Sequence, residues 1–171
     1  LLAGIHAGAK RIVCTSTAGV LGPSGPGNVV DEYSPQPENF FTDYEASKSI
    51  LEKTLKTIQN TGIEIVIVNP TRVYGPGVLS DSNGVTRMMQ KYAAGKWHII
   101  PGNGKSIGNY VYVEDVVQGH LLAMKKGRPG GRYVLGGENL TYDELFGIMA
   151  ELSGKKYQLF HLPVPVMEFV A

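Results

Sequence analysis

The chain has 171 residues, of which 43% are hydrophobic and 18% are charged, a composition that excludes intrinsic disorder for most of its length. The sequence has 16 Lys and Arg residues and 15 Asp and Glu residues, so the formal net charge is only +1. Because binding to nucleic acid needs clustered cations, this balance argues against nucleic acid as the partner and favours a small molecule.

The first predicted strand ends in three hydroxyl residues. Residues 1–8 have the pattern of a helix end closed by glycine, and residues 11–14 form a short apolar run typical of a buried parallel strand. The run delivers Thr15, Ser16 and Thr17 at its C-terminal end, where open α/β sheets bind ligands. The single cysteine, Cys14, lies in this run, so no disulfide framework or cysteine-based zinc site is expected. A reducing, cytoplasmic setting follows as an expectation.

A helix and a second strand follow. Residues 19–37 are rich in glycine and proline and predict an irregular loop, and apolar positions at three- and four-residue steps predict an amphipathic helix over residues 42–60. Residues 63–68 predict a β-branched strand that Asn69 and Pro70 break. The order strand, helix, strand indicates one βαβ unit. This strand is the longest strongly apolar run and is too short to cross a bilayer, so no membrane partner is expected.

The second half of the chain predicts smaller elements. They are a helix over residues 85–94, a short stretch over 97–100, a turn over 102–104, a strand over 110–113, a helix over 114–126, a strand over 132–135 and a further helix. Thr141 and Glu144 form a capping box at the start of that last helix, and Glu138 is expected in a surface turn. Residues 163–170 look like the entrance of another helix.

Tyr44 and Lys48 carry the chemistry that the sequence suggests. They are four residues apart on one predicted helix, so their side chains project from the same face. A tyrosine hydroxyl is a poor proton donor at neutral pH, and a nearby ammonium favours its phenolate form. A second match with the same spacing, Tyr92 and Lys96, has no hydroxyl-bearing strand before it, so we expect Tyr44 and Lys48 to be the functional pair.

The chain resembles the extended short-chain dehydrogenase/reductases, which include sugar-nucleotide epimerases, dehydratases and dihydroflavonol-type reductases. The resemblance rests on four segments in order, residues 13–18, 44–48, 69–77 and 110–116. It implies an α/β fold, with a partial Rossmann-like parallel sheet covered by helices on both faces and a small mixed C-terminal substrate-binding region. Residues 1–75 would belong to the NAD(P)-binding domain, and residues 76–171 mainly to a substrate-binding or lid region.

The same resemblance implies roles for individual residues. Thr17 would be the catalytic hydroxyl, Tyr44 the general acid and base, and Lys48 the cation that holds the nicotinamide ribose and activates Tyr44. The remaining residues implied to contact cofactor or substrate are Pro70, Thr71 and Val73 for NADP or NAD, and Ser16, Asn69 and Arg87 for the substrate. No metal is expected.

Two departures narrow the choice within the family. Ala18 and Gly19 follow Thr17 where a 4,6-dehydratase would carry an acidic pair, which argues against that activity. Gly108 and Asn109 stand where sugar-nucleotide epimerases usually carry a diphosphate-binding arginine, although Arg72, Arg87 or Lys91 could replace it. The sequence therefore favours a dihydroflavonol-reductase-like enzyme acting on a carbonyl or alcohol. An NAD-dependent sugar-nucleotide epimerase and a non-catalytic cofactor-sensing protein are the alternatives.

The cofactor-phosphate motif of the family does not occur in this sequence. A Gly-x-x-Gly-x-x-Gly turn would bring backbone amides to the dinucleotide phosphates, and we expect it in a preceding segment of roughly 90 to 100 residues. The chain alone is therefore expected to bind nicotinamide cofactor poorly and to expose a sheet edge. The expected partners are a carbonyl or sugar substrate and, by analogy with the family, a second copy in a homodimer.

Overall fold

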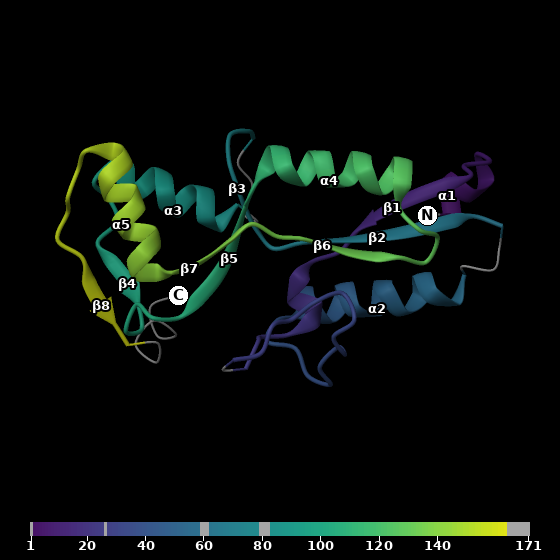
Figure 1. Ribbon diagram of the computed structural model, residues 1–171, viewed down its shortest axis with the longest axis horizontal. Coiled ribbons are helices and arrows are strands. Elements are labelled where there is room, and N and C mark those ends of the chain that lie inside the picture. Colours follow the sequence, from purple (N-terminus) through teal and green to yellow (C-terminus); the bar gives the residue numbers. More distant parts are fainter. Residues whose placement is uncertain (1, 26, 59–61, 79–82, 164–171) are drawn as a thin grey trace. The chain divides into compact units, whose positions relative to one another are not determined.

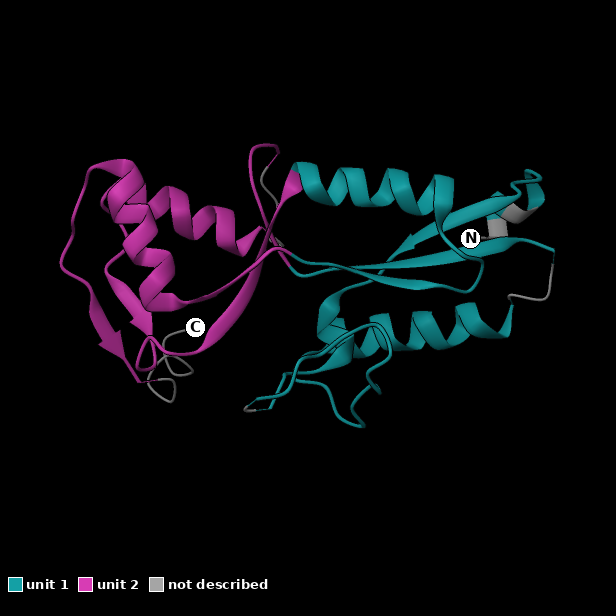
Figure 2. Cartoon of the chain, in the orientation of Figure 1, with its two compact units in different colours: residues 1–71, 114–136 teal, residues 72–113, 137–171 magenta. Residues whose placement is uncertain are grey.

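A computed structural model describes residues 2–25, 27–58, 62–78 and 83–163. The chain divides into two compact units, which Figure 2 shows in teal and magenta. The first unit comprises residues 1–71 and 114–136, and the second comprises residues 72–113 and 137–171. The chain thus leaves the first unit after Thr71 and returns to it at Glu114.

The first unit is built on a sheet of three parallel strands in the order β1-β2-β6 (Figure 1). Its strands are β1 (Arg11–Thr15), β2 (Glu64–Pro70) and β6 (Arg132–Leu135), and its helices are α1 (Leu2–His6), the short 3₁₀ helix η1 (Ala18–Leu21), α2 (Asp43–Thr57) and α4 (Val113–Lys126). Helix α2 covers one face of the sheet and α4 covers the other. The predicted α/β class, with a parallel sheet and helices on both faces, is confirmed.

Strand β2 is buried on both faces, in agreement with its continuous apolar run over residues 65–68. Ile65 and Ile67 pack with Leu55 of α2. Val66 and Val68, which point to the opposite face because side chains alternate along a strand, pack with Ala123 of α4. The central strand therefore anchors two separate hydrophobic clusters, one under each helix.

The predicted break at Asn69 and Pro70 is wrong, because both residues belong to β2. The N–H of Ile67 donates to the carbonyl of Gly131, just before β6, and the N–H of Thr71 donates to Leu135 of β6. Backbone nitrogens alternate between the two neighbours of a strand, so the nitrogen of Pro70 faces the β1 side. Pairing with β1 ends at Val68, so no partner there requires the N–H that proline lacks. Pro70 is tolerated because it lies just past the end of the ladder with β1, while its pairing with β6 does not use its nitrogen.

The loop after β1 is more regular than predicted. Residues Ala18–Leu21 form one turn of 3₁₀ helix, and Thr17 caps it by accepting a hydrogen bond from Gly19. Helix α2 begins at Asp43, and Thr42 and Glu45 form a reciprocal capping box that fixes its first turn. The local start of each element is therefore set by a threonine side chain.

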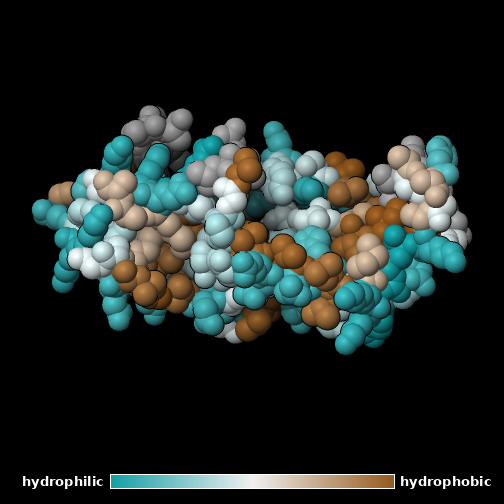
Figure 3. Space-filling view, turned by 90° about the horizontal axis from the view of Figure 1, so that it is seen from above, coloured by the Kyte–Doolittle hydropathy of each residue, from teal (hydrophilic) through white to brown (hydrophobic). Residues whose placement is uncertain are grey.

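Helix α4 presents apolar side chains to solvent. Figure 3 views the chain from the side of α4 and shows exposed hydrophobic surface over this part. The exposed apolar residues of the helix are Val117, Leu121, Leu122 and Met124. None of the helices in the described ranges combines the length and the apolarity that a membrane crossing needs.

In the part of the second unit that the structure describes, residues 72–78, 83–113 and 137–163, there are two small sheets and two helices (Figure 1). In one sheet β5 (Ile107–Tyr112) lies between β3 (Arg72–Tyr74), to which it is parallel, and β7 (Glu138–Thr141), to which it is antiparallel. In the other, β4 (Ile99–Pro101) pairs in parallel with β8 (Phe160–Leu162). The helices are α3 (Gly84–Ala93) and α5 (Tyr142–Ser153).

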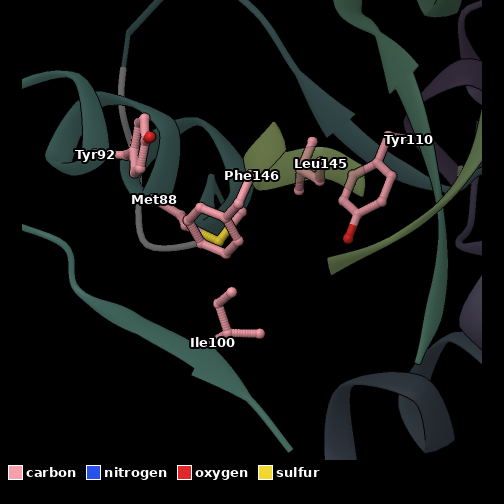
Figure 4. Packing of buried hydrophobic residues seen from close by; sticks show 6 residues of the cluster. All are labelled: Met88, Tyr92, Ile100, Tyr110, Leu145 and Phe146. Carbon is pink, nitrogen blue, oxygen red and sulfur yellow. The ribbon is translucent and has the colours of Figure 1, made fainter. Parts of the chain in front are cut away.

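A hydrophobic core joins these elements, and Figure 4 shows its buried members. They are Met88, Tyr92, Ile100, Tyr110, Leu145 and Phe146. The ring centroids of Tyr92 and Phe146 are 5.6 Å apart and the rings are tilted against each other, within the distance range that aromatic pairs prefer. Helices α3 and α5 are therefore held together through aromatic and aliphatic contacts.

Several expectations for the second unit are corrected. Glu138 is not in a turn but is the first residue of β7, opposite Tyr110. Strand β5 starts three residues earlier than predicted, and Val113 already belongs to α4. The predicted helix entrance over residues 163–170 lies outside the described residues except for Pro163.

The start of α5 carries a pH-sensitive ion pair in addition to the predicted capping box of Thr141 and Glu144, which is confirmed. Asp143 pairs with Lys105 at 2.9 Å and with His161 at 3.0 Å. Hydrogen bonds from Lys105 and then His161 lower the pKa of Asp143 below its ordinary 3.8. A carboxyl whose pKa is depressed by folding stabilises the folded state above the unfolded pKa, and this contribution is lost as the pH falls through the folded-state value.

We therefore expect Asp143→Asn to lower the melting temperature of the protein that carries this chain at pH 7. The difference from the unmodified protein should shrink as the pH falls below 3.8. Thermal melts across this range test it, with Glu138→Gln, an exposed carboxylate on β7, as the control. A deficit that stays constant down to acid unfolding would contradict the electrostatic origin.

Candidate active site

The hydroxyl-bearing turn at the end of β1 is fixed by backbone contacts. The N–H of Ser16 donates to the carbonyl of Val68 at 2.8 Å, which carries the strand pairing one residue past β1. The Oγ1 of Thr17 accepts from the N–H of Gly19 at 3.2 Å. A threonine hydroxyl also has one hydrogen to donate, so this contact leaves the proton of Thr17 available.

Ser16 and Thr17 differ in their surroundings. The Ser16 side chain is buried, and its Oγ has no hydrogen-bond partner among the described residues. Thr17 is half-buried at the carboxyl end of β1. Of the two hydroxyls, that of Thr17 is thus the one that this geometry leaves more accessible.

Tyr44 and Lys48 lie one turn apart in the first half of α2. The Nζ of Lys48 is 5.7 Å from the centroid of the Tyr44 ring and donates a hydrogen bond to the carbonyl of Thr15 at 3.1 Å. The Tyr44 side chain is 57% exposed. The structure therefore brings the tyrosine, the ammonium group and the turn that carries Thr17 into one region of the first unit.

Asn69 lies inside the unit rather than on its surface. It is fully buried on the α2 side of β2. Its Nδ2 donates to the carbonyl of Thr17 at 2.9 Å and to Oε1 of Glu52 at 2.7 Å. Both N–H bonds of the amide are thus used within the protein.

A buried polar cluster surrounds Glu52, which the sequence analysis did not identify. The carboxylate is fully buried, and its Oε2 accepts from Gln36 at 2.8 Å and from Arg132 of β6 at 2.7 Å. Ser49 extends the cluster by donating to Gln36 at 2.8 Å. The only local sign in the sequence is that Glu52 follows Lys48 by four residues and so falls on the same helix face. We call Gln36, Ser49, Glu52, Asn69 and Arg132 the Glu52 cluster.

The segment predicted to bind the cofactor, residues 70–73, begins in the first unit and ends in the second. Pro70 ends β2, and Thr71 continues its ladder by donating to the carbonyl of Leu135 at 3.1 Å. Val73 lies in β3 of the second unit, opposite Val111 of β5. Pro70 and Thr71 therefore share the carboxyl end of the sheet with Thr17.

Arg87, predicted to contact the substrate, lies on α3 in the second unit. Another cation of this unit, Arg72, has its guanidinium 5.7 Å from the centroid of the Tyr110 ring. Gly108 and Asn109 stand where an epimerase is expected to carry arginine, and Asn109 donates to the carbonyl of Gly137 at 2.8 Å and to Asn139 at 2.9 Å. Asn109 thus joins β5 to β7.

The second Tyr-Lys match is structural. Tyr92 is buried in the core of the second unit, and its hydroxyl donates to the carbonyl of Lys155 at 3.1 Å. Lys96 is exposed beyond the end of α3. The hydroxyl of Tyr92 is therefore already committed within the fold, in contrast to the exposed Tyr44.

The second unit contains an apolar cavity of about 480 Å³. Its lining is mostly aromatic and aliphatic and comprises Tyr74, Met89, Tyr92, Ala93, Tyr110, Glu138, Leu140, Leu145, Ile148, Met149, Leu152 and Ser153. The buried Tyr110 hydroxyl has no hydrogen-bond partner among the described residues, and burial raises the pKa of Tyr110, with Arg72 partly offsetting that effect. This lining carries one acidic side chain and no basic one.

Comparison with known proteins gives a consistent result. The chain is 31% identical over 167 residues to sterol demethylase protein B of Methylococcus capsulatus, covering 97% of this chain and 49% of the relative. It is 34% identical over 155 residues to a putative dihydroflavonol 4-reductase of Synechocystis, covering 86% and 42%. The chain therefore spans about half the length of the curated relatives that it matches.

A solved structure agrees with these relatives. The UDP-glucose 4-epimerase of Thermus thermophilus, solved in complex with NAD, superposes with a TM-score of 0.81 at 26% identity, over 95% of this chain and 54% of that one. Residues 1–136 match the model of the NAD dependent epimerase/dehydratase family. The chain belongs to the NAD dependent epimerase/dehydratase family, as the resemblance of its four ordered segments predicted.

Proposed function

We propose that the protein carrying this chain is an NAD(P)-dependent oxidoreductase that interconverts a carbonyl compound and the corresponding alcohol. One observation carries the proposal. The ammonium group of Lys48 lies 5.7 Å from the ring of the exposed Tyr44 and 3.1 Å from the carbonyl of Thr15, two residues before Thr17. A proton donor, a cation and a hydroxyl thus gather at the carboxyl end of a parallel sheet, where α/β folds bind ligands.

The three side chains divide the proton chemistry between them. In the reduction, the hydroxyl of Thr17 keeps its proton and donates a hydrogen bond to the substrate oxygen, which holds the carbonyl in place. Tyr44 then transfers its proton to the same oxygen as negative charge develops there, and the ammonium group of Lys48 stabilises the resulting phenolate. Solvent returns the proton to the exposed Tyr44 after the product leaves.

The residues near Tyr44 fit the nicotinamide end of the cofactor, which supplies or accepts the hydride when it is bound. Lys48 has three N–H donors and uses one on Thr15, so two can meet the ribose hydroxyls. Pro70 and Thr71 lie at the adjacent end of β2, and we assign them, with Val73, to the carboxamide side. The family name and the NAD complex of the Thermus epimerase support a nicotinamide cofactor.

Two observations favour a reductase over an epimerase. Among the described residues, no basic side chain lines the cavity of the second unit, whereas binding a diphosphate calls for charge-assisted contacts. Gly108 and Asn109 stand where an epimerase would carry arginine; glycine has no side chain to bind a diphosphate, and Asn109 joins two strands. An apolar carbonyl substrate suits this lining better than a sugar nucleotide, and the reductase named among the relatives supports it.

Cofactor consumption separates the two activities. We expect the whole protein to oxidise NADPH or NADH in a one-to-one ratio with the ketone or aldehyde that it reduces, monitored by the loss of reduced-cofactor absorbance. A panel of aromatic and aliphatic carbonyl compounds should contain a substrate, with UDP-glucose as the comparison. Conversion of UDP-glucose to its C4 epimer without net cofactor turnover would replace the reductase assignment with the epimerase one.

A further inference from the structure

The Glu52 cluster connects the interior of the first unit to the proposed catalytic turn. Its link is Asn69, whose single nitrogen donates both to Oε1 of Glu52 and to the carbonyl of Thr17. No other hydrogen bond of the cluster among the described residues reaches the turn that carries Thr17. Asn69 therefore couples a buried charge to a backbone group of the active site.

We propose that Glu52 and Asn69 are a positioning pair that sets the orientation of Thr17, and that Asn69 acts through this turn rather than by contacting the substrate. The proposal rests on the proposed function. Asn69 is fully buried and both of its N–H bonds are occupied, which leaves no donor for a substrate. Its Oδ1 has no hydrogen-bond partner among the described residues, but this oxygen is itself buried and so is shielded from a substrate.

The chemistry of the carboxylate explains how the pair can fix an orientation. A carboxylate only accepts hydrogen bonds, so Glu52 requires the nitrogen end of the Asn69 amide to face it. The same nitrogen is then aimed at the carbonyl of Thr17. Gln36 and Arg132 occupy the other oxygen of Glu52, so the carboxylate cannot rotate without losing a charge-assisted bond.

The turn is held on both sides of Thr17. Lys48 holds the carbonyl of Thr15, Val68 accepts from the N–H of Ser16, and Asn69 holds the carbonyl of Thr17 itself. The N–H of Gly19 then donates to Oγ1 of Thr17 and so orients the hydroxyl group. Loss of the Asn69 bond would free the peptide between Thr17 and Ala18, and small misplacements of a reacting group can lower rates about 100-fold.

A double-mutant cycle on Thr17 and Asn69 in the whole protein tests the proposal. We expect Asn69→Ala to lower kcat by about 10- to 100-fold with the cofactor Kd unchanged. Thr17→Ala should itself lower kcat by about 100-fold or more. Adding Asn69→Ala to Thr17→Ala should lower kcat by no more than about twofold further, because no hydroxyl then remains to be positioned.

Glu52→Gln provides a second, nearly isosteric test that does not leave a cavity. The substituted amide must keep its oxygen towards Arg132 and Gln36, so its nitrogen would face Asn69 and force the Asn69 amide to turn. We expect a fall in kcat similar to that of Asn69→Ala. Ser49→Ala is the control, since it removes a buried hydrogen bond at the far end of the cluster and should lower the melting temperature but leave kcat within about twofold.

The outcomes are distinguishable. If Asn69→Ala lowers kcat by the same factor with and without Thr17, or if Ser49→Ala costs as much kcat, the pair does not act through Thr17 and the proposal is overturned. An unchanged kcat in Glu52→Gln would also overturn it. If Thr17→Ala leaves kcat intact, the error lies in the proposed function, because Thr17 is then not part of the proton-transfer set.

Discussion

Replacing Tyr44 with phenylalanine should reduce turnover by at least about 100-fold while leaving the affinity for the nicotinamide cofactor nearly unchanged. The substitution removes only the hydroxyl oxygen and keeps the ring that lies beside Lys48. Because Tyr44 is exposed, the change creates no cavity and should not alter the melting temperature. The experiment compares kcat for carbonyl reduction with the cofactor Kd from fluorescence titration, both in the whole protein.

Tyr92→Phe is the matched control, because Tyr92 belongs to the other Tyr-Lys match in the same chain. Its hydroxyl bonds to the carbonyl of Lys155, and the ring that lines the cavity is kept, so the loss of the hydroxyl should cost about 1 kcal/mol of stability and lower kcat far less than Tyr44→Phe does. Full turnover in Tyr44→Phe would remove the proton donor from the proposed mechanism. No turnover in the unmodified protein, with cofactor binding intact, would instead favour the alternative of a cofactor-sensing protein, which has no need of a proton donor.

Removing the cation of the Glu52 cluster should have the largest effect on folding. Arg132→Met leaves the fully buried Glu52 carboxylate without its only charged partner in the described cluster, and breaking a buried pair from one side costs about 3 to 5 kcal/mol. Methionine is apolar and of similar length, so most of the loss comes from the unpaired charge. Urea denaturation, with the free energy of unfolding extrapolated to water, measures the effect.

Arg11→Met is the control for Arg132→Met, since Arg11 also lies on a strand of the same sheet and also pairs with a glutamate. The Arg11 and Glu64 side chains are 21% and 48% exposed, against 12% and 0% for Arg132 and Glu52. The more exposed pair should contribute only about 0 to 1 kcal/mol. Equal losses in the two variants would show that burial of Glu52 does not dominate the energetics of the cluster.

Local patterns in the sequence determined the elements whose signals lie within a few residues of each other. The capping box of Thr141 and Glu144 is confirmed because both of its hydrogen bonds join residues three apart. The common face of Tyr44 and Lys48 follows from helical periodicity alone. The β-branched residues over 63–68 predicted a strand, and β2 forms there because these side chains favour extended backbone.

Tertiary structure decided the features that depend on pairing between distant segments. Whether Pro70 ends a strand depends on which neighbour its nitrogen faces, and that follows from the register with β1 and β6. Strands β7 and β8 are too short to be recognised without their partners β5 and β4. The Glu52 cluster brings together a helix, two strands and a loop, with Arg132 lying 80 residues from Glu52. A hydrogen bond across such a separation leaves no periodic trace in the sequence, so only the fold shows that Asn69 connects a buried charge to Thr17.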